Sequence, residues 1–183
     1  SFEHRMITSQ PFAGQMIDVD VPTHVMGTLH FDNGAVGTIL TTFDVYYPGQ
    51  ARFEIYGTKG TMIVPDPNTF GGPVLLMRPE DVEAMHSDPG LRTGNLPAYA
   101  GYKEIPLLFD YNVNSRALGL SDMCKALRTG RDFRANCQQQ YHVLEILTSF
   151  EKSSREGKFI PLTTHYTRTA PMKNNPMHGI LDD

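Results

Sequence analysis

The sequence predicts an α+β fold: an open, mostly antiparallel, twisted sheet of about six to eight strands with helices packed on one face. Two observations lead to this prediction. Residues 24–64 alternate side chains with a period of two between glycine-containing turns, which is typical of antiparallel strands with one buried face. Residues 115–157 instead repeat apolar side chains every three to four positions, which is typical of amphipathic helices. The 183-residue chain is long enough for one domain, which we expect to cover residues 1–183.

The strongest strand signal is a hairpin predicted from residues 24–31 and 36–43. Asn33 and Gly34 lie between the two segments, and both readily adopt the positive φ angles that a two-residue hairpin turn requires. The second segment is rich in β-branched residues, which favour strands. We therefore expect these two segments to pair in antiparallel fashion.

Shorter runs bounded by turn residues predict further strands. They are residues 52–56, 61–64, 74–77, 103–107 and 158–162. The strand at residues 103–107 is expected at a sheet edge, because Pro106 cannot donate a backbone hydrogen bond. Residues 1–20 are expected to form an extended lead-in to the first strand or an edge strand. Residues 79–101 show no sustained periodicity, which indicates a long surface excursion.

Two helices are predicted after residue 114. The first is expected to be capped by Ser115 and to end at Gly130. Its apolar stripe consists of Leu120, Met123, Cys124 and Leu127. The second begins near Asn136, with Gln139 at the third position of a capping box, and ends at Gly157. Its stripe consists of Val143, Ile146, Leu147 and Phe150. Each stripe needs an apolar surface to cover it, and we expect the sheet to supply that surface.

Composition excludes several classes of protein. The formal net charge is −4 and no basic cluster occurs, which argues against nucleic acid as a partner. No apolar run approaches the roughly 18 residues of a membrane span, so we expect no membrane partner and a cytoplasmic location. The two cysteines, Cys124 and Cys137, are too few for a disulfide framework and fit no metal-site spacing, so we expect reduced thiols.

Six short segments occur together in the order of a known family. They are residues 21–24 (Val-Pro-Thr-His), 31–35 (Phe-Asp-Asn-Gly-Ala), 54–61 (Glu-Ile-Tyr-Gly-Thr-Lys-Gly-Thr), 66–68 (Asp-Pro-Asn), 114–119 (Asn-Ser-Arg-Ala-Leu-Gly) and 142–145 (His-Val-Leu-Glu). Together they resemble the C-terminal domain of the glucose-fructose oxidoreductase, inositol dehydrogenase and rhizopine-catabolism (Gfo/Idh/MocA) family. The resemblance extends over nearly the whole chain.

The resemblance implies a parent enzyme that transfers hydride between NAD or NADP and a sugar, polyol or related alcohol. In that family this domain is only the second half of the enzyme, and an N-terminal dinucleotide-binding (Rossmann) domain precedes it. The family's Glu-Lys-Pro lysine has no counterpart here, and its helical Asp-x-Gly-x-His motif would lie before Ser1. We therefore expect the Rossmann half to be absent from this chain and to be its partner.

The chain's own motifs agree with a domain that binds no cofactor by itself. A dinucleotide site needs Gly-x-Gly-x-x-Gly after a strand, and no two of the 16 glycines have Gly-x-Gly spacing. The sequence has no Gly-x-Ser-x-Gly and no His-x-x-x-His motif. His24 and His30 share a predicted strand face, but six residues separate them by roughly 20 Å, too far for a shared metal. We expect no catalytic residue, bound cofactor or metal.

Five hydrogen-bonding side chains remain as candidates for contacts to a sugar-like substrate. They are His24, Tyr46, Tyr47, Asn68 and Arg116. Each also has a structural explanation. His24 can be a partly buried strand residue, and the two tyrosines can be core or interface aromatics. Asn68 can serve turn geometry, and Arg116 can pair with Asp122 or with a carboxylate at a sheet edge.

Two functions from different classes fit the sequence. The first is the substrate-side and oligomerisation domain of a NAD(P)-dependent oxidoreductase. The alternative is a freestanding, non-catalytic binding or assembly module that uses its open sheet. In either case two helices of about 15 residues, roughly 22 Å long, can cover only one sheet face. We therefore expect the other face to pair with a second copy.

Overall fold

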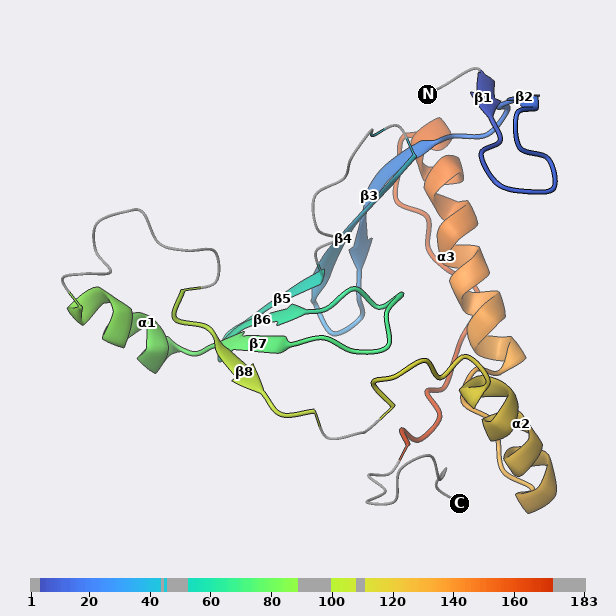
Figure 1. The fold of residues 1–183 in the computed structure, drawn as a ribbon. Coiled ribbons are helices and arrows are strands. Elements are labelled where there is room, and N and C mark those ends of the chain that lie inside the picture. Colours follow the sequence, from blue (N-terminus) through green and yellow to red (C-terminus); the bar gives the residue numbers. More distant parts are fainter. Residues whose placement is uncertain (1–3, 44, 46–52, 89–99, 108–110, 173–183) are drawn as a thin grey trace. The chain divides into compact units, whose positions relative to one another are not determined.

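The structure is a computed structural model that describes residues 4–43, 45, 53–88, 100–107 and 111–172 (Figure 1). It divides into two compact units, which are treated separately below. Unit 1 is Ser1–Pro48 with Cys137–Thr167, and unit 2 is Gly49–Asn136 with Arg168–Asp183. The described residues form eight strands and three helices, and every strand pair is antiparallel. The α+β class with open, antiparallel sheets is therefore confirmed, whereas a single domain over residues 1–183 stays a prediction.

Unit 1 contains two hairpins. Strands β1 (His4–Met6) and β2 (Met16–Asp18) form a small two-stranded sheet where an extended lead-in or an edge strand was expected. Strands β3 (His24–His30) and β4 (Val36–Thr42) form the predicted hairpin, with His30 opposite Val36 next to the turn. Gly34 has a φ of 85°, as this turn requires.

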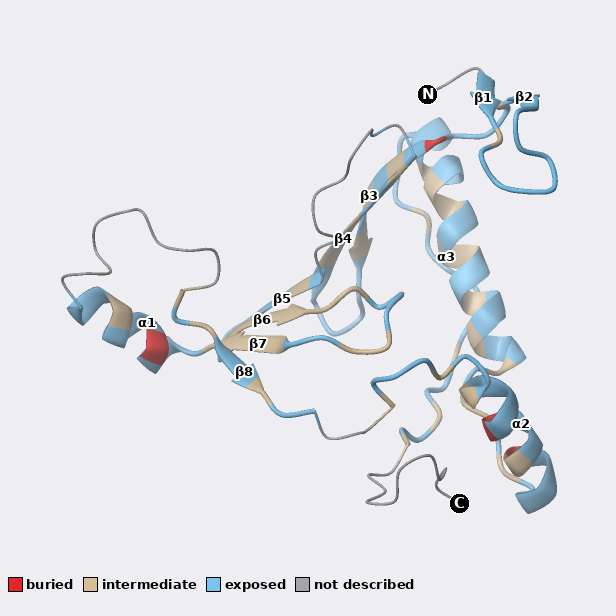
Figure 2. Cartoon of the chain, viewed as in Figure 1, coloured by how far each residue is buried: buried red, intermediate tan, exposed pale blue. Residues whose placement is uncertain are grey.

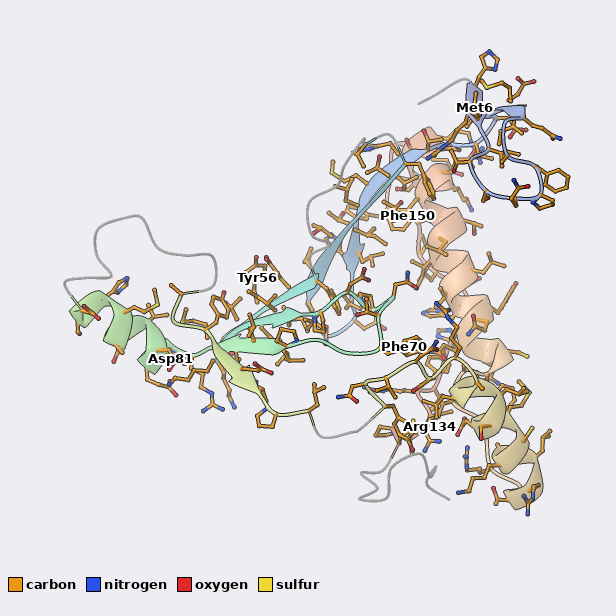
Figure 3. The ribbon with its side chains drawn as sticks, in the orientation of Figure 1. Met6, Tyr56, Phe70, Asp81, Arg134 and Phe150 are labelled. Atoms are coloured by element: carbon orange, nitrogen blue, oxygen red, sulfur yellow. The ribbon has the colours of Figure 1, made fainter. Side chains whose placement is uncertain are left out.

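Helix α3 (Cys137–Glu156) lies beside β3 in unit 1 and ends at Gly157, which has a φ of 64°, as predicted (Figure 1). Phe150 projects from the helix onto the backbone of Gly27 (Figure 3). A Cβ atom at Gly27 would lie 2.4 Å from Phe150 Cε1, so only glycine permits this close approach. The helix therefore covers the face of β3 to which Gly27 belongs.

The opposite face of the β3–β4 hairpin is exposed. Met26 lies opposite Leu40 across the hairpin, and the two residues are 73% and 60% exposed. Val36, on the same face, is exposed as well. The alternation along β3 therefore separates a face under α3 from a face on which the apolar residues Met26, Leu40 and Val36 are exposed.

Unit 2 contains a four-stranded sheet in the order β5-β6-β7-β8. Its strands are β5 (Phe53–Gly57), β6 (Gly60–Val64), β7 (Val74–Met77) and β8 (Lys103–Ile105). All four were predicted, and β8 is an edge strand followed by Pro106, as expected. The eight described strands thus lie in three sheets, whereas the sequence predicted one.

Helix α1 (Pro79–Ser87) replaces part of the surface excursion predicted for residues 79–101. The sequence around the start of this helix favours a helix N-terminus, although the apolar periodicity of the helix is weak. Pro79 occupies the first turn, and the Asp81 carboxylate accepts a hydrogen bond of 3.0 Å from the backbone N–H of Arg78. Residues 89–99 of the excursion lie outside the described residues.

Helix α2 (Leu118–Thr129) confirms the first predicted helix and ends at Gly130, which has a φ of 70°. The predicted cap at Ser115 is wrong. Ala117 precedes the helix without a side-chain cap, and the Ser115 hydroxyl donates to the carbonyl of Val113, because the helix begins three residues later. The buried residues of α2 are Asp122 and Ala126, and its predicted apolar stripe is exposed (Figure 2).

Residues 158–162 were predicted to form a strand, and this prediction is wrong. The structure has no strand at these residues, which follow α3 without regular secondary structure. The Ser153 hydroxyl of α3 donates a 2.7 Å hydrogen bond to the carbonyl of Lys158. Residues 158–166, named the C-terminal segment below, therefore pair with the helix rather than with a sheet. None of the helices in the described residues combines the length and apolarity needed to cross a membrane.

Candidate functional site

A groove in unit 1 runs between the end of β3, helix α3 and the C-terminal segment. Its volume is about 650 Å³, and we name it the α3 groove. Its lining residues are Thr28, Leu29, His30, Phe31, Asp32, His142, Ile146, Ser149, Phe150, Ser153, Phe159, Ile160, Pro161, Leu162, Thr164 and His165. The volume lies in the range of roughly 300–1,000 Å³ that is typical of small-molecule sites.

The C-terminal segment is fixed to α3 by the carboxylate of Glu145. One carboxylate oxygen accepts hydrogen bonds from the backbone N–H and the hydroxyl of Thr163, at 2.9 and 2.7 Å. The other accepts from the N–H of Thr164 at 2.9 Å and from the Thr164 hydroxyl. These donors favour the charged carboxylate, and the Thr164 hydroxyl, the largest cause, helps lower the Glu145 pKa to about 2. One glutamate therefore holds one wall of the groove.

Three histidines from different parts of unit 1 line this groove. His142 lies on α3, and its Nδ1 is 2.7 Å from the hydroxyl oxygen of Thr164. His30 lies at the end of β3, and its ring meets that of Phe159 edge to face at a centroid distance of 4.5 Å. His165 comes from the C-terminal segment. The groove thus combines imidazoles with an apolar floor that includes Phe150.

Permanent charge is scarce in the groove. Asp32 is the one carboxylate among the lining residues, and no lysine or arginine lines the groove. The Glu145 carboxylate is occupied by Thr163 and Thr164. Phosphate and carboxylate ligands are usually held by arginine or lysine, so this lining does not favour anionic ligands. The described residues contain no cluster of three potential metal ligands.

The predicted substrate contacts lie elsewhere. His24 is exposed at the start of β3 in unit 1 and does not line the groove. In unit 2, Asn68 is exposed in a turn, where its backbone N–H donates a hydrogen bond of 2.8 Å to the Asp66 side chain. Tyr46 and Tyr47 lie outside the described residues. The substrate-binding roles of these four residues stay predictions.

Arg116, the fifth candidate, lies in unit 2 near the start of α2. Its guanidinium carbon is 5.6 Å from the centre of the Phe70 ring, a cation–π distance. One structural alternative for Arg116 was a pair with Asp122, and Asp122 instead binds Arg131 and Arg134. The role of Arg116 in substrate binding stays a prediction.

Sequence reasoning missed the groove histidines for identifiable reasons. His30 was considered only as a metal ligand, and His142 only as part of a family motif. His165 lies in a C-terminal stretch with little periodicity, so no local pattern marks it. The hydrogen bonds that hold the C-terminal segment and its His165 beside α3 join residues 18 to 22 positions apart in the sequence. No short-range sequence pattern reveals such bonds.

An ion cluster in unit 2 has a structural role. The buried Asp122 carboxylate accepts a hydrogen bond of 2.7 Å from the Arg131 guanidinium and one of 2.9 Å from the backbone N–H of Arg134. The Arg134 side chain also reaches Asp122 and donates 3.1 Å to the carbonyl of Ala170 (Figure 3). Burial alone would raise the Asp122 pKa, but these donors outweigh it and hold the pKa below its usual range. The cluster connects the end of α2 to residues 169–171.

The described residues do not fit a dinucleotide. Such a site needs a glycine-rich turn between a strand and a helix N-terminus. Here α1 is the helix that directly follows a strand of a sheet, and Met77, Arg78 and Pro79 form that connection without glycine. NAD or NADP therefore has no cradle in the described part of this chain.

Comparison with protein families identifies the N-terminal third of the chain. Residues 4–63 match the family model of the GFO/IDH/MocA C-terminal domain. Over these residues the match supports a GFO/IDH/MocA-type C-terminal domain. The matched residues include the β3–β4 hairpin of unit 1 and β5 of unit 2. The chain matches neither a curated protein nor a solved structure. The helices and the C-terminal segment lie beyond the matched residues.

Proposed function

We propose that this GFO/IDH/MocA-type domain is the substrate-side and oligomerisation half of a NAD(P)-dependent oxidoreductase that acts on a sugar, polyol or related alcohol. The family match over residues 4–63 is the observation that carries the proposal. A Rossmann domain is the partner that supplies NAD or NADP, because the described residues fit no dinucleotide. The domain by itself is inactive.

The substrate-side role rests on polar residues that are accessible in the structure. His24, Asn68 and Arg116 are exposed, so each can donate or accept hydrogen bonds to the hydroxyl groups of an alcohol. The oligomerisation role rests on the exposed face of the β3–β4 hairpin. Met26 and Leu40 form an apolar pair on that face, which a second copy would cover.

The parent gene offers the first test. The proposal expects a strand, a Gly-x-Gly-x-x-Gly turn and a helix to be encoded in frame upstream of residue 1. A reading frame that begins at residue 1 would instead favour a freestanding assembly module.

Calorimetry offers a second test on the chain itself. We expect no saturable binding of NAD or NADP to the 183-residue chain, and binding once a Rossmann domain is joined to it. Millimolar or tighter binding by this chain without that domain would contradict the proposal.

A further inference from the structure

We infer that the α3 groove is a binding site for a neutral small molecule that has a flat apolar part and a hydroxylated part. The site goes beyond the proposed function, because none of the described substrate-contact candidates lines the groove. Its volume of about 650 Å³ suits a ligand of drug size.

The lining specifies the two parts of the ligand. Phe150 and Ile146 of α3 supply an apolar floor. Phe159 stands beside it with 65% of its surface exposed, although its ring already meets His30 edge to face. An exposed aromatic ring at the edge of an apolar groove gains stability when a flat apolar group covers it. The apolar part of the ligand therefore lies against Phe150 and Phe159.

The polar part of the ligand meets imidazoles and hydroxyls. His142 and His165 line the groove together with Ser149, and these groups can both donate and accept hydrogen bonds. Among the described residues no lysine or arginine lines the groove, so an anionic ligand would lack a permanent counter-charge from them. Hydroxyl groups match this lining better than phosphate or carboxylate groups do.

The groove wall is held in place before any ligand binds. Glu145 fixes the backbone of Thr163 and Thr164, and the neighbouring His165 is presented from that fixed segment. A wall held by four hydrogen bonds to one carboxylate loses little entropy when a ligand binds. This preorganisation distinguishes the groove from an incidental gap beside a helix.

The test uses phenyl β-D-glucopyranoside as the probe, titrated into the full chain with histidine-selective NMR detection of the imidazoles. We expect saturable binding with Kd below about 1 mM and glucose binding at least about tenfold weaker. Equal affinity for the two compounds, or no saturable binding of the probe, would overturn the proposal.

Two variants locate the site. Ser149→Trp fills the groove and abolishes binding, whereas Ser154→Trp, at an exposed position of the same helix outside the groove, leaves it unchanged. His165→Ala truncates an exposed side chain, keeps the fold, and weakens binding about tenfold. Unchanged binding by a folded Ser149→Trp or His165→Ala protein would contradict the assignment. A third outcome would also contradict it: a dimer that forms without the probe and that Ser149→Trp dissociates. A second copy of the chain would then occupy the groove.

Discussion

Helices α3 and α2 were predicted from the same apolar spacing, yet their surroundings in the two units differ. Helix α3 has its Phe150 on the backbone of Gly27, and its Glu145 holds the C-terminal segment. Helix α2 leaves Leu127 77% exposed and buries Asp122, a carboxylate bound by two arginines. The comparison teaches that an apolar stripe predicts a helix but does not identify what covers it.

The largest expected effect on stability comes from the close contact between Gly27 of β3 and Phe150 of α3 in unit 1. Gly27→Val would place side-chain atoms where Phe150 Cε1 lies 2.4 Å from the position of a Cβ. We expect a loss of about 3 kcal/mol in the free energy of unfolding, measured by urea denaturation. Gly119→Ala in α2 is the matched control, since nothing lies within 4 Å of a Cβ there. Equal losses from both variants would show that α3 does not pack on Gly27.

The second prediction concerns the buried charge of unit 2. Asp122→Asn keeps the side-chain shape but leaves Arg131 and Arg134 without a carboxylate. We expect a loss of about 2 kcal/mol at pH 7 in the same assay. Glu151→Gln on α3 is the control, because its 3.9 Å pair with Arg155 is exposed and contributes almost nothing. A loss equal to that of the control would mean that the Asp122 cluster does not stabilise the end of α2.

The third prediction is a pH dependence in unit 1. Folding lowers the Glu145 pKa from 4.5 to about 2, so its stabilisation is complete above about 4.5 and is lost as the pH falls toward 2. Glu145→Gln should therefore melt at a lower temperature than the wild type at pH 7. The difference should shrink between pH 4.5 and 2. A difference that is independent of pH would contradict the role of the carboxylate charge.

The smallest effect is expected on the exposed stripe of α2. Leu127→Ser should change the free energy of unfolding by less than about 0.5 kcal/mol, because the side chain is already in contact with water. Thermal melting of the isolated chain measures this. A loss above about 2 kcal/mol would mean that another surface covers the stripe in solution.

Local features of the sequence predicted much of the fold. The turn at Asn33 and Gly34 specified the β3–β4 hairpin, and the glycines at positions 130 and 157 specified the ends of the two predicted helices. These signals act over a few residues, so a single sequence carries them. The start of α1 at Pro79 was overlooked because its apolar periodicity is weak.

The groove could not be predicted in the same way. Its wall depends on hydrogen bonds from Thr163 and Thr164 to Glu145, 18 and 19 residues earlier in the chain. Residues 158–162 have an apolar, strand-like composition, and these bonds keep them beside a helix instead. Tertiary hydrogen bonds therefore overrode local propensity at the place where the candidate site forms.

We expect this domain to self-associate through the exposed face of the β3–β4 hairpin. Sedimentation equilibrium at micromolar concentration tests it most directly. We predict a dimer or larger species for the wild type and a folded 20.5 kDa monomer for Leu40→Lys. Ile39→Lys should unfold the protein, because Ile39 shares the face of Gly27. A wild-type monomer of 20.5 kDa, or a Leu40→Lys protein that remains associated, would contradict it.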